Sequence, residues 1–208
     1  MTDLPDRVGG RLALDFVNTV DPRHSPGRRE FLTSYANLLD WAEPLGADLP
    51  HAVSALRAAA AADPSQAQQA FDRAIQLREA LYRVFAAALA RRAVAGEDLA
   101  VVNALLGAAT DHHVLVPAPG GGIRDGWADV EALDSMLWPV VIDAWDLLTT
   151  SALERVRECP GDGTCGWLFL DTSRSGTRRW CDMRTCGNRA KVRTHYARGH
   201  HAASPGPD

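Results

Sequence analysis

Four cysteines stand in the last quarter of the chain, in the pattern Cys159-x5-Cys165-x15-Cys181-x4-Cys186, and the sequence contains no others. Two close pairs separated by a loop suit a tetrahedral four-thiolate zinc site, because each pair supplies two thiolates from one tight turn. Four thiolates leave no open position for water, so we expect one structural Zn2+ per chain and no catalytic metal. Two disulfides are the alternative.

The cellular compartment bears on that choice. The first residues, MTDLPDRVGG, carry no apolar stretch typical of a secretory signal. No run approaches about 18 consecutive apolar residues, the length that spans a membrane. We therefore expect a cytoplasmic protein with no membrane partner. Paired cysteines in the cytosol are metal-binding more often than disulfide-bonded, which favours zinc.

Charge is distributed unevenly along the chain. Between Thr172 and His201 there are eight basic residues and one acid, Asp182, which gives this segment a net charge of +7. The whole chain carries −4, so the remainder carries −11. An acidic body with a basic C-terminal segment is the pattern of a protein that binds a polyanion. A solubilising tail is the alternative, but this segment is interleaved with cysteines and Trp180.

Most of the chain before the cysteines has helical periodicity. The run at 11–20 fits either a short strand or the first turns of a helix. Beyond it, apolar spacing, alanine content and stop signals predict further helices, which cover Tyr35 to about Gly46, residues 51–62, a long helix opened by Asp63 and Pro64, Glu97 to about Thr110, and about Asp134 to Val156 with Pro139 near its start. Residues 113–127 predict two short strands around the triple glycine. The predicted fold class is mainly α with a small β element (α+β).

The cysteine segment has its own predicted order of elements. Turn residues between Cys159 and Cys165 suit a zinc knuckle, and residues 166–171 read as a strand leaving it. A basic helix is then expected to begin at Cys186, where the helix dipole favours a thiolate. Knuckle, strand, second cysteine pair and helix together predict a treble-clef-like finger, with Trp167, Phe169 and Trp180 as its small core.

Three short motifs in this segment resemble a known family. CGWLFLDTS at 165–173, RRWC at 178–181 and CGNRAK at 186–191 closely resemble the CGNR zinc finger. That finger is usually found at the C-terminus of proteins with an ABATE domain, a family of proposed stress-induced transcriptional regulators. LDFVNT at 14–19 resembles the opening motif of that domain. The expected organisation is an ABATE-like helical body at 1–155, the finger at 156–201 and a disordered tail at 202–208.

The resemblance implies that Cys159, Cys165, Cys181 and Cys186 bind the zinc. It also implies that the finger takes part in DNA binding and transcription regulation, with Asn188, Arg189 and Lys191 in the signature on the finger helix. His195, His200 and His201 are expected to face solvent or phosphate, since four cysteines already satisfy the metal.

Candidate DNA contacts follow from the charges of the finger. Arg189 and Arg193 are four residues apart, so they project together from a helix, while Lys191 lies on another stripe. Arg174, Arg178 and Arg179 precede Cys181 and could grip the duplex backbone. Structural roles are the alternative: Asn188 could cap backbone groups, and Arg189 could pair with Asp171 or Asp182.

The N-terminal motif places Asp15, Asn18 and Thr19 in an apolar run. One interpretation is capping and turn formation. The other is a small-molecule pocket between this segment and the helices that carry Arg78, Tyr82 and Trp145. The whole sequence lacks a nucleophile elbow, a phosphate loop, an HExxH motif and a dinucleotide fingerprint, so we expect no enzyme.

These observations predict a DNA-binding transcription regulator with a structural four-cysteine zinc finger, a sensing body and double-stranded DNA as partner. A homodimer would double the footprint of one small finger. The alternative is a zinc-stabilised module that binds a protein or RNA.

Overall fold

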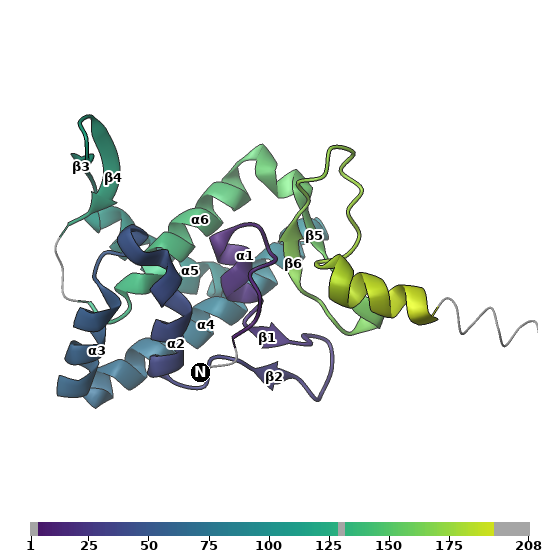
Figure 1. The fold of residues 1–208 in the computed structure, drawn as a ribbon, viewed down its shortest axis with the longest axis horizontal. Helices are drawn as coiled ribbons and strands as arrows, with labels where there is room; N and C mark the ends of the chain where they lie inside the picture. Colours follow the sequence, from purple (N-terminus) through teal and green to yellow (C-terminus); the bar gives the residue numbers. More distant parts are fainter. Residues whose placement is uncertain (1–3, 129–131, 194–208) are drawn as a thin grey trace, which may run out of the picture.

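A helical body packs around one short buried helix. The computed structural model describes residues 4–128 and 132–193. Helix α1 (Leu12–Val17) lies near the centre of the molecule (Figure 1), where Leu14, Phe16 and Val17 are fully buried. Its start is held by Asp143, whose carboxylate accepts the Ala13 N–H at 2.8 Å. The ambiguous segment at 11–20 is therefore a helix that ends before a short strand.

Longer helices surround α1. They are α2 (Tyr35–Ala42), α3 (Val53–Ala62), α4 (Pro64–Leu89), α5 (Gly96–His112) and α6 (Trp138–Thr149). Helix α4 begins as predicted: the Asp63 carboxylate accepts the Gln66 N–H at 2.9 Å and Pro64 occupies the first turn. The mainly helical fold class predicted from the sequence is confirmed.

Short 3-10 segments complete the helical part, at η1 (Glu43–Asp48), η2 (Ser135–Leu137), η3 (Ser151–Arg155) and η4 (Gly161–Gly163). The helix expected over about 134–156 is wrong in its length. Helix α6 ends at Thr149 because Thr150 is extended, and the Thr150 hydroxyl accepts the Ala152 N–H that opens η3. Pro139 lies in the first turn of α6, as expected.

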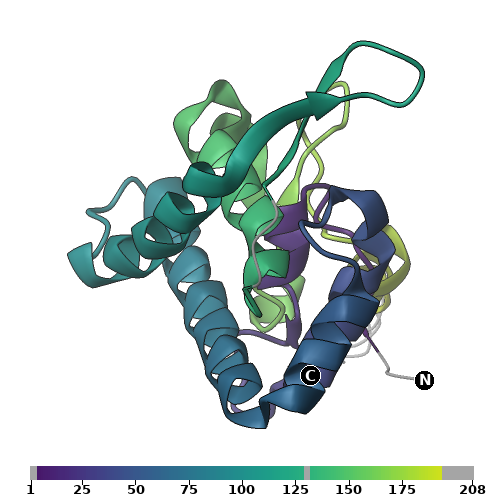
Figure 2. The ribbon, with the colours of Figure 1, turned by 90° about the vertical axis from the view of Figure 1, so that its left-hand side faces the viewer.

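The strands form three separate antiparallel pairs. β1 (Val20–Asp21) pairs with β2 (Arg29–Glu30), and β3 (His113–Pro117) pairs with β4 (Ile123–Trp127) in the hairpin predicted around the triple glycine. This second hairpin projects away from the helices in both views (Figures 1 and 2). The third pair, β5 (Val156–Glu158) with β6 (Leu168–Leu170), belongs to the cysteine segment.

Two hydrophobic clusters divide the described residues. The larger fills the body between α1, α2, α4 and α6, and it also contains Val156 of β5 and Leu168 of β6. The smaller consists of the four cysteines and Phe169, with Val8, Trp167 and Trp180 packed against it. The small aromatic core predicted for the finger is thus present, and one strand pair contributes to both clusters.

Candidate metal centre and nucleic-acid interface

The first cysteine pair lies on a knuckle between β5 and β6. The Gly166 N–H donates to the Cys159 carbonyl at 3.1 Å, and the Cys159 N–H donates to the Trp167 carbonyl at 2.8 Å. Gly161 lies inside this turn with a φ of +28°. A Cβ at Gly161 would lie 2.0 Å from the Cys165 Cβ, so the knuckle leaves no room for a side chain at Gly161.

The second pair brackets the start of the finger helix. Cys181 precedes it and Cys186 lies in its first turn, η5 (Met183–Gly187), which continues as α-helix over 188–193. The prediction that the helix begins at Cys186 is wrong by three residues. The reason is Asp182, whose carboxylate accepts the Arg184 N–H at 3.0 Å and caps the helix before Met183.

The four thiols converge on one point. All four Sγ atoms lie within 4.8 Å of one another, and every cysteine is buried. Cys181 Sγ lies 3.8 Å from Cys165 Sγ and 3.7 Å from Cys186 Sγ. Ligands at the usual zinc–sulfur distance of about 2.3 Å in a tetrahedron are about 3.8 Å apart. The site therefore fits one structural Zn2+, and the cysteines are free thiols rather than disulfides.

Hydrogen bonds tune the acidity of the cluster. The other thiols donate to Cys159 Sγ and, with the Cys181 N–H, lower the pKa of Cys159 to about 2. The hydrogen bond that Cys165 donates to Cys159 raises the pKa of Cys165, and burial raises the pKa of Cys186. Zn2+ binds thiolates, so it must displace the thiol protons, and metal loading weakens as the pH falls.

The ABATE-like motif joins the finger to the body. The Asn18 side-chain amide donates to the Leu168 carbonyl at 2.8 Å, and its oxygen accepts the Leu168 N–H at 2.9 Å. Trp167 Nε1 donates to the Val20 carbonyl at 2.8 Å. Asn18 is 2% exposed, so these two hydrogen bonds are shielded from water. They satisfy the Leu168 N–H and C=O of β6 from the body side.

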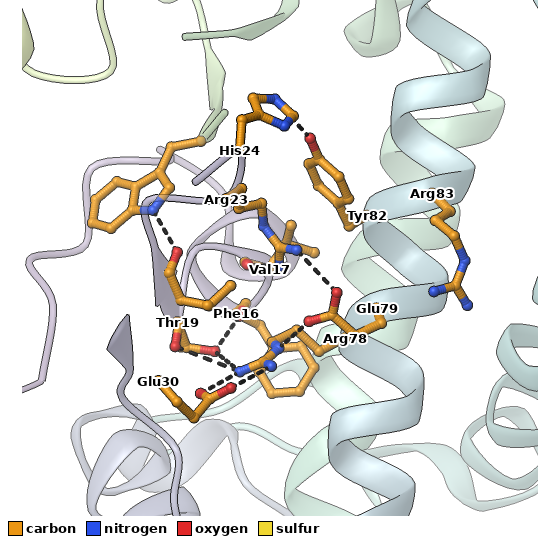
Figure 3. A network of polar contacts seen from close by, with 12 residues as sticks. Phe16, Val17, Thr19, Arg23, His24, Glu30, Arg78, Glu79, Tyr82 and Arg83 are labelled. Atoms are coloured by element: carbon orange, nitrogen blue, oxygen red, sulfur yellow. Dashed lines mark hydrogen bonds and ion pairs between the residues drawn. The ribbon is translucent and has the colours of Figure 1, made fainter. Parts of the chain in front are cut away.

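A buried polar network lies beside this junction (Figure 3). The Arg78 guanidinium, 1% exposed, donates to both carboxylate oxygens of Glu30 at 2.6 Å and to Thr19 Oγ1 at 3.3 Å. Glu79 links Arg78 to Arg23, at 2.9 Å and 3.2 Å respectively. Paired, hydrogen-bonded charges of this kind are costly to break singly, so the network fixes the β1–β2 hairpin on α4.

The same network reaches the finger. The Arg23 guanidinium lies over the Tyr82 ring, 4.1 Å from its centroid. The Tyr82 hydroxyl contacts His24 Nε2 at 3.2 Å and donates to Glu158 at 3.3 Å, while His24 pairs with Glu158 at 2.6 Å. Glu158 immediately precedes the zinc ligand Cys159. No pattern in the sequence connects these residues, because they come from three distant segments.

The structure gives internal partners to five side chains of the predicted ligand site, Asp15, Asn18, Thr19, Arg78 and Tyr82. Asp15 accepts the Gly9 N–H at 2.7 Å, and burial raises the pKa of Asp15 to about 6. Asn18 holds β6, whereas Thr19 and Arg78 contact each other. Tyr82 belongs to the junction with Glu158. Trp145 is 51% exposed on α6. A ligand site at these residues stays a prediction, and it would have to compete with the contacts described.

Arg178, one of the residues predicted to grip the duplex backbone, has several contacts within the chain. Its guanidinium lies 4.6 Å above the centroid of Phe169 and donates to the carbonyls of Trp180, Val8 and Cys181. Its own N–H donates to Asp171, whose pKa is lowered by hydrogen bonds from Ser173 and Arg178. Arg178 therefore closes the loop before Cys181, and its guanidinium donates hydrogen bonds to main-chain carbonyl groups.

The other predicted DNA contacts lie at the surface. Arg174 and Arg179 are exposed on the loop, with Arg179 over the Trp180 ring at 5.0 Å from its centroid. The finger helix exposes Asn188, Arg189, Lys191 and Arg193. Asn188 donates to the Arg184 carbonyl at 3.0 Å, as a structural role would require. Arg189 interacts electrostatically with Asp21 of the body. Asp182, one of the predicted partners of Arg189, caps the finger helix. His195, His200, His201 and the predicted disordered tail at 202–208 lie outside the described residues.

The site and fold define a zinc-finger protein whose finger is set into a helical body. Comparison with family models agrees: residues 10–151 match ABATE, described as "Putative stress-induced transcription regulator", and residues 155–199 match the CGNR zinc finger. The chain belongs to the ABATE family and carries a CGNR zinc finger at 155–199. A search of curated proteins found no match. In the part of the chain that the structure describes, no helix has the length and apolar character needed to cross a membrane.

Proposed function

We propose that this protein is a cytoplasmic transcription regulator that binds double-stranded DNA through its zinc finger. The observation that carries the proposal is the position of the four-thiolate centre at the start of the helix over 183–193. Zinc fixes that helix on the body, and the helix exposes Arg184, Arg189 and Lys191. A rigid basic helix on an otherwise acidic chain suits a polyanionic partner.

The helix has the dimensions and charge to enter a major groove. Arg189 and Arg193 are one helical turn apart and contact the same strand region in this proposal, while Arg174 and Arg179 approach the flanking phosphates. Phosphate contacts position the finger, and base contacts from the helix supply sequence preference. In this proposal the Zn2+ is structural and not catalytic, and the protein has no enzymatic activity.

The test is a titration of the zinc-loaded full chain against a randomised duplex pool at two salt concentrations, with sequencing of the retained DNA. The variant Arg189→Ala/Arg193→Ala is expected to weaken binding about tenfold or more while zinc content stays at one per chain. The matched control Arg57→Ala/Arg124→Ala removes the same charge from α3 and β4, which lie at the opposite end of the molecule (Figure 1). The control is expected to bind like the wild type.

An unchanged affinity in the finger variant would overturn DNA binding by this helix. Retention of single-stranded RNA without duplex DNA would favour the RNA-binding alternative. If the chain binds neither nucleic acid at either salt concentration, a protein partner is favoured. Sedimentation of the complex would also give the number of chains on one duplex, which tests the proposed homodimer.

We also propose that the body senses a small molecule near Thr19, Arg78 and Tyr82. The support is the polar network that runs from Arg78 through Glu79, Arg23 and Tyr82 to Glu158, next to a zinc ligand. A ligand that exchanges these contacts for its own would act on the finger directly. A thermal-shift screen of metabolites on the full chain tests this role, with Tyr82→Phe as the comparison variant. If no compound raises the melting temperature, the sensing role is overturned.

A further inference from the structure

The β1–β2 hairpin of the body is attached to the zinc knuckle. The Arg23 N–H donates to the Cys165 carbonyl at 2.8 Å, and the His24 N–H donates to the Thr164 carbonyl at 3.0 Å. Gly166 faces the same hairpin so closely that a Cβ there would lie 2.5 Å from His24 Nε2. The hairpin therefore keeps a fixed position relative to the metal centre and to the helix that follows it (Figure 1).

Two arginines stand on the returning side of this hairpin. Arg28 and Arg29 are both exposed, and Arg29 lies over the Phe31 ring at 4.7 Å from its centroid. Arg29 is the strand partner of Asp21. Asp21 in turn interacts electrostatically with Arg189 of the finger helix. Asp21 thus lies between the strand that carries Arg29 and the finger helix, although 160 positions separate Arg29 from Arg189 in sequence.

An acidic notch lies between the hairpin, which carries one basic group, and the finger helix, which carries the other. A cavity of about 120 Å³ between hairpin and finger is lined by Asp6, Asp21, Asp182 and Arg189, together with cysteine and apolar side chains. Three carboxylates against one guanidinium repel phosphate from the notch itself. A polyanion that contacts both basic groups must therefore span the notch, with phosphates on either side of it.

We propose that Arg28 and Arg29 of the body form a second phosphate-binding point, so that the DNA backbone is held on both sides of the acidic notch. This inference rests on the proposed DNA binding by the finger. It assigns the body a direct part in recognition: the hairpin sets the angle at which the finger helix meets the duplex. Because phosphate contacts carry no sequence information, the hairpin adds affinity and orientation rather than specificity.

The experiment compares Arg28→Ala/Arg29→Ala with the wild type in duplex titrations from low to high salt, using the zinc-loaded full chain. Each lost phosphate contact reduces the slope of log affinity against log salt by about 0.9, so we expect a slope smaller by about 1 to 2 and affinity lower by about tenfold. The loss should be similar for every duplex sequence. Arg28→Lys/Arg29→Lys should restore most of the affinity, since a phosphate contact needs charge more than a planar fork.

The outcomes separate this inference from the proposed function. If Arg189→Ala/Arg193→Ala weakens binding but Arg28→Ala/Arg29→Ala changes neither affinity nor salt slope, the hairpin contact is overturned and the finger contact stands. If neither variant affects binding, the proposed function itself fails. Should the double variant lose zinc, Arg28→Gln alone provides the test, with an expected slope change of about 1. Arg57→Ala/Arg124→Ala again controls for net charge.

Discussion

Gly161 shows how one residue can limit a metal site without binding the metal. A Cβ at this position would lie 2.0 Å from the Cys165 Cβ, 3.4 Å from its Sγ and 3.5 Å from the Cys186 Sγ. Gly163, two residues later, also has a positive φ, at +80°, but nothing lies within 4 Å of its Cβ position. Substitutions at the two positions therefore distinguish steric conflict with the zinc ligands, which arises at Gly161, from backbone strain alone, which arises at Gly163.

We predict that Gly161→Ala weakens zinc binding and lowers the melting temperature of the chain, because the knuckle must open to admit the methyl group. Gly163→Ala should cost about 1 kcal/mol through strain alone and keep one zinc per chain. Competition with a chromogenic chelator measures the affinity, and thermal unfolding measures the stability. Wild-type zinc affinity in Gly161→Ala would show that the knuckle is less tightly packed than described.

Adjacent arginines can have different roles that the sequence does not reveal. Arg178 and Arg179 stand side by side in a basic loop, and both are natural candidates for phosphate contacts. In the structure the Arg178 guanidinium donates to the carbonyls of Val8 and Cys181. Arg179 is exposed and lies over the Trp180 ring. The partners of Arg178 include a residue 170 positions away, so charge and spacing alone could not predict its role.

At the scale of elements, helix α1 links the two parts of the chain. Its buried face packs in the body, and Asn18 at its C-terminal end pairs with both backbone groups of Leu168 in β6. The sequence alone allows two roles for Asn18, turn formation or part of a ligand pocket. Its actual partner lies 150 residues away and is a backbone group, which has no sequence signal.

We predict that Asn18→Ala lowers the free energy of unfolding by about 2–4 kcal/mol, because it leaves a buried N–H and a buried C=O of β6 unpaired. Asn103→Ala on the exposed face of α5 is the control and should change stability by less than about 0.5 kcal/mol. Urea unfolding of both variants measures the difference. If Asn18→Ala lowers the free energy of unfolding no more than the control does, water or another group replaces the hydrogen bonds of Asn18.

Elements were predictable where periodicity extends over several turns. Helix α4 has 26 residues and a capping Asp63–Pro64 start, so its apolar stripe and its first residue both follow from the sequence. Helix α1 has six residues, too few to distinguish a helical period from an alternating one. The strands β1 and β2 have two residues each and depend on Arg78, Glu30 and the finger for their position, which no local pattern encodes.

At the scale of the whole molecule, the finger and the body share a core. Val156 and Leu168 flank the zinc knuckle yet are fully buried in the hydrophobic cluster of the body. The sequence predicted the four clustered cysteines and the order of the finger's elements. The depth of the contact between the two parts depends on backbone hydrogen bonds and on tertiary packing, so it emerged from the structure alone.

We predict that removing zinc loosens α1 as well as the finger. Hydrogen exchange of the full chain, with and without a zinc chelator, should show faster exchange at residues 12–17 when the metal is lost, because β6 no longer holds Asn18. Residues 53–62 in α3 provide an internal control and should change little. Unchanged protection of α1 alongside loss of protection at 159–186 would show that the finger unfolds without affecting the body.

Several hydrogen bonds between the body and the finger use main-chain groups of the finger: the N–H and C=O of Leu168, the N–H of Leu170 and the carbonyls of Thr164 and Cys165. Every sequence carries these groups, so the joint places little demand on the side chains of the finger helix. The exposed helix can therefore change residue by residue while the joint stays intact. The body can therefore act as a common scaffold: a finger with the same knuckle length, the same β6 register and the same side chains at 156, 167 and 168 can be exchanged as a cassette while its exposed helix differs.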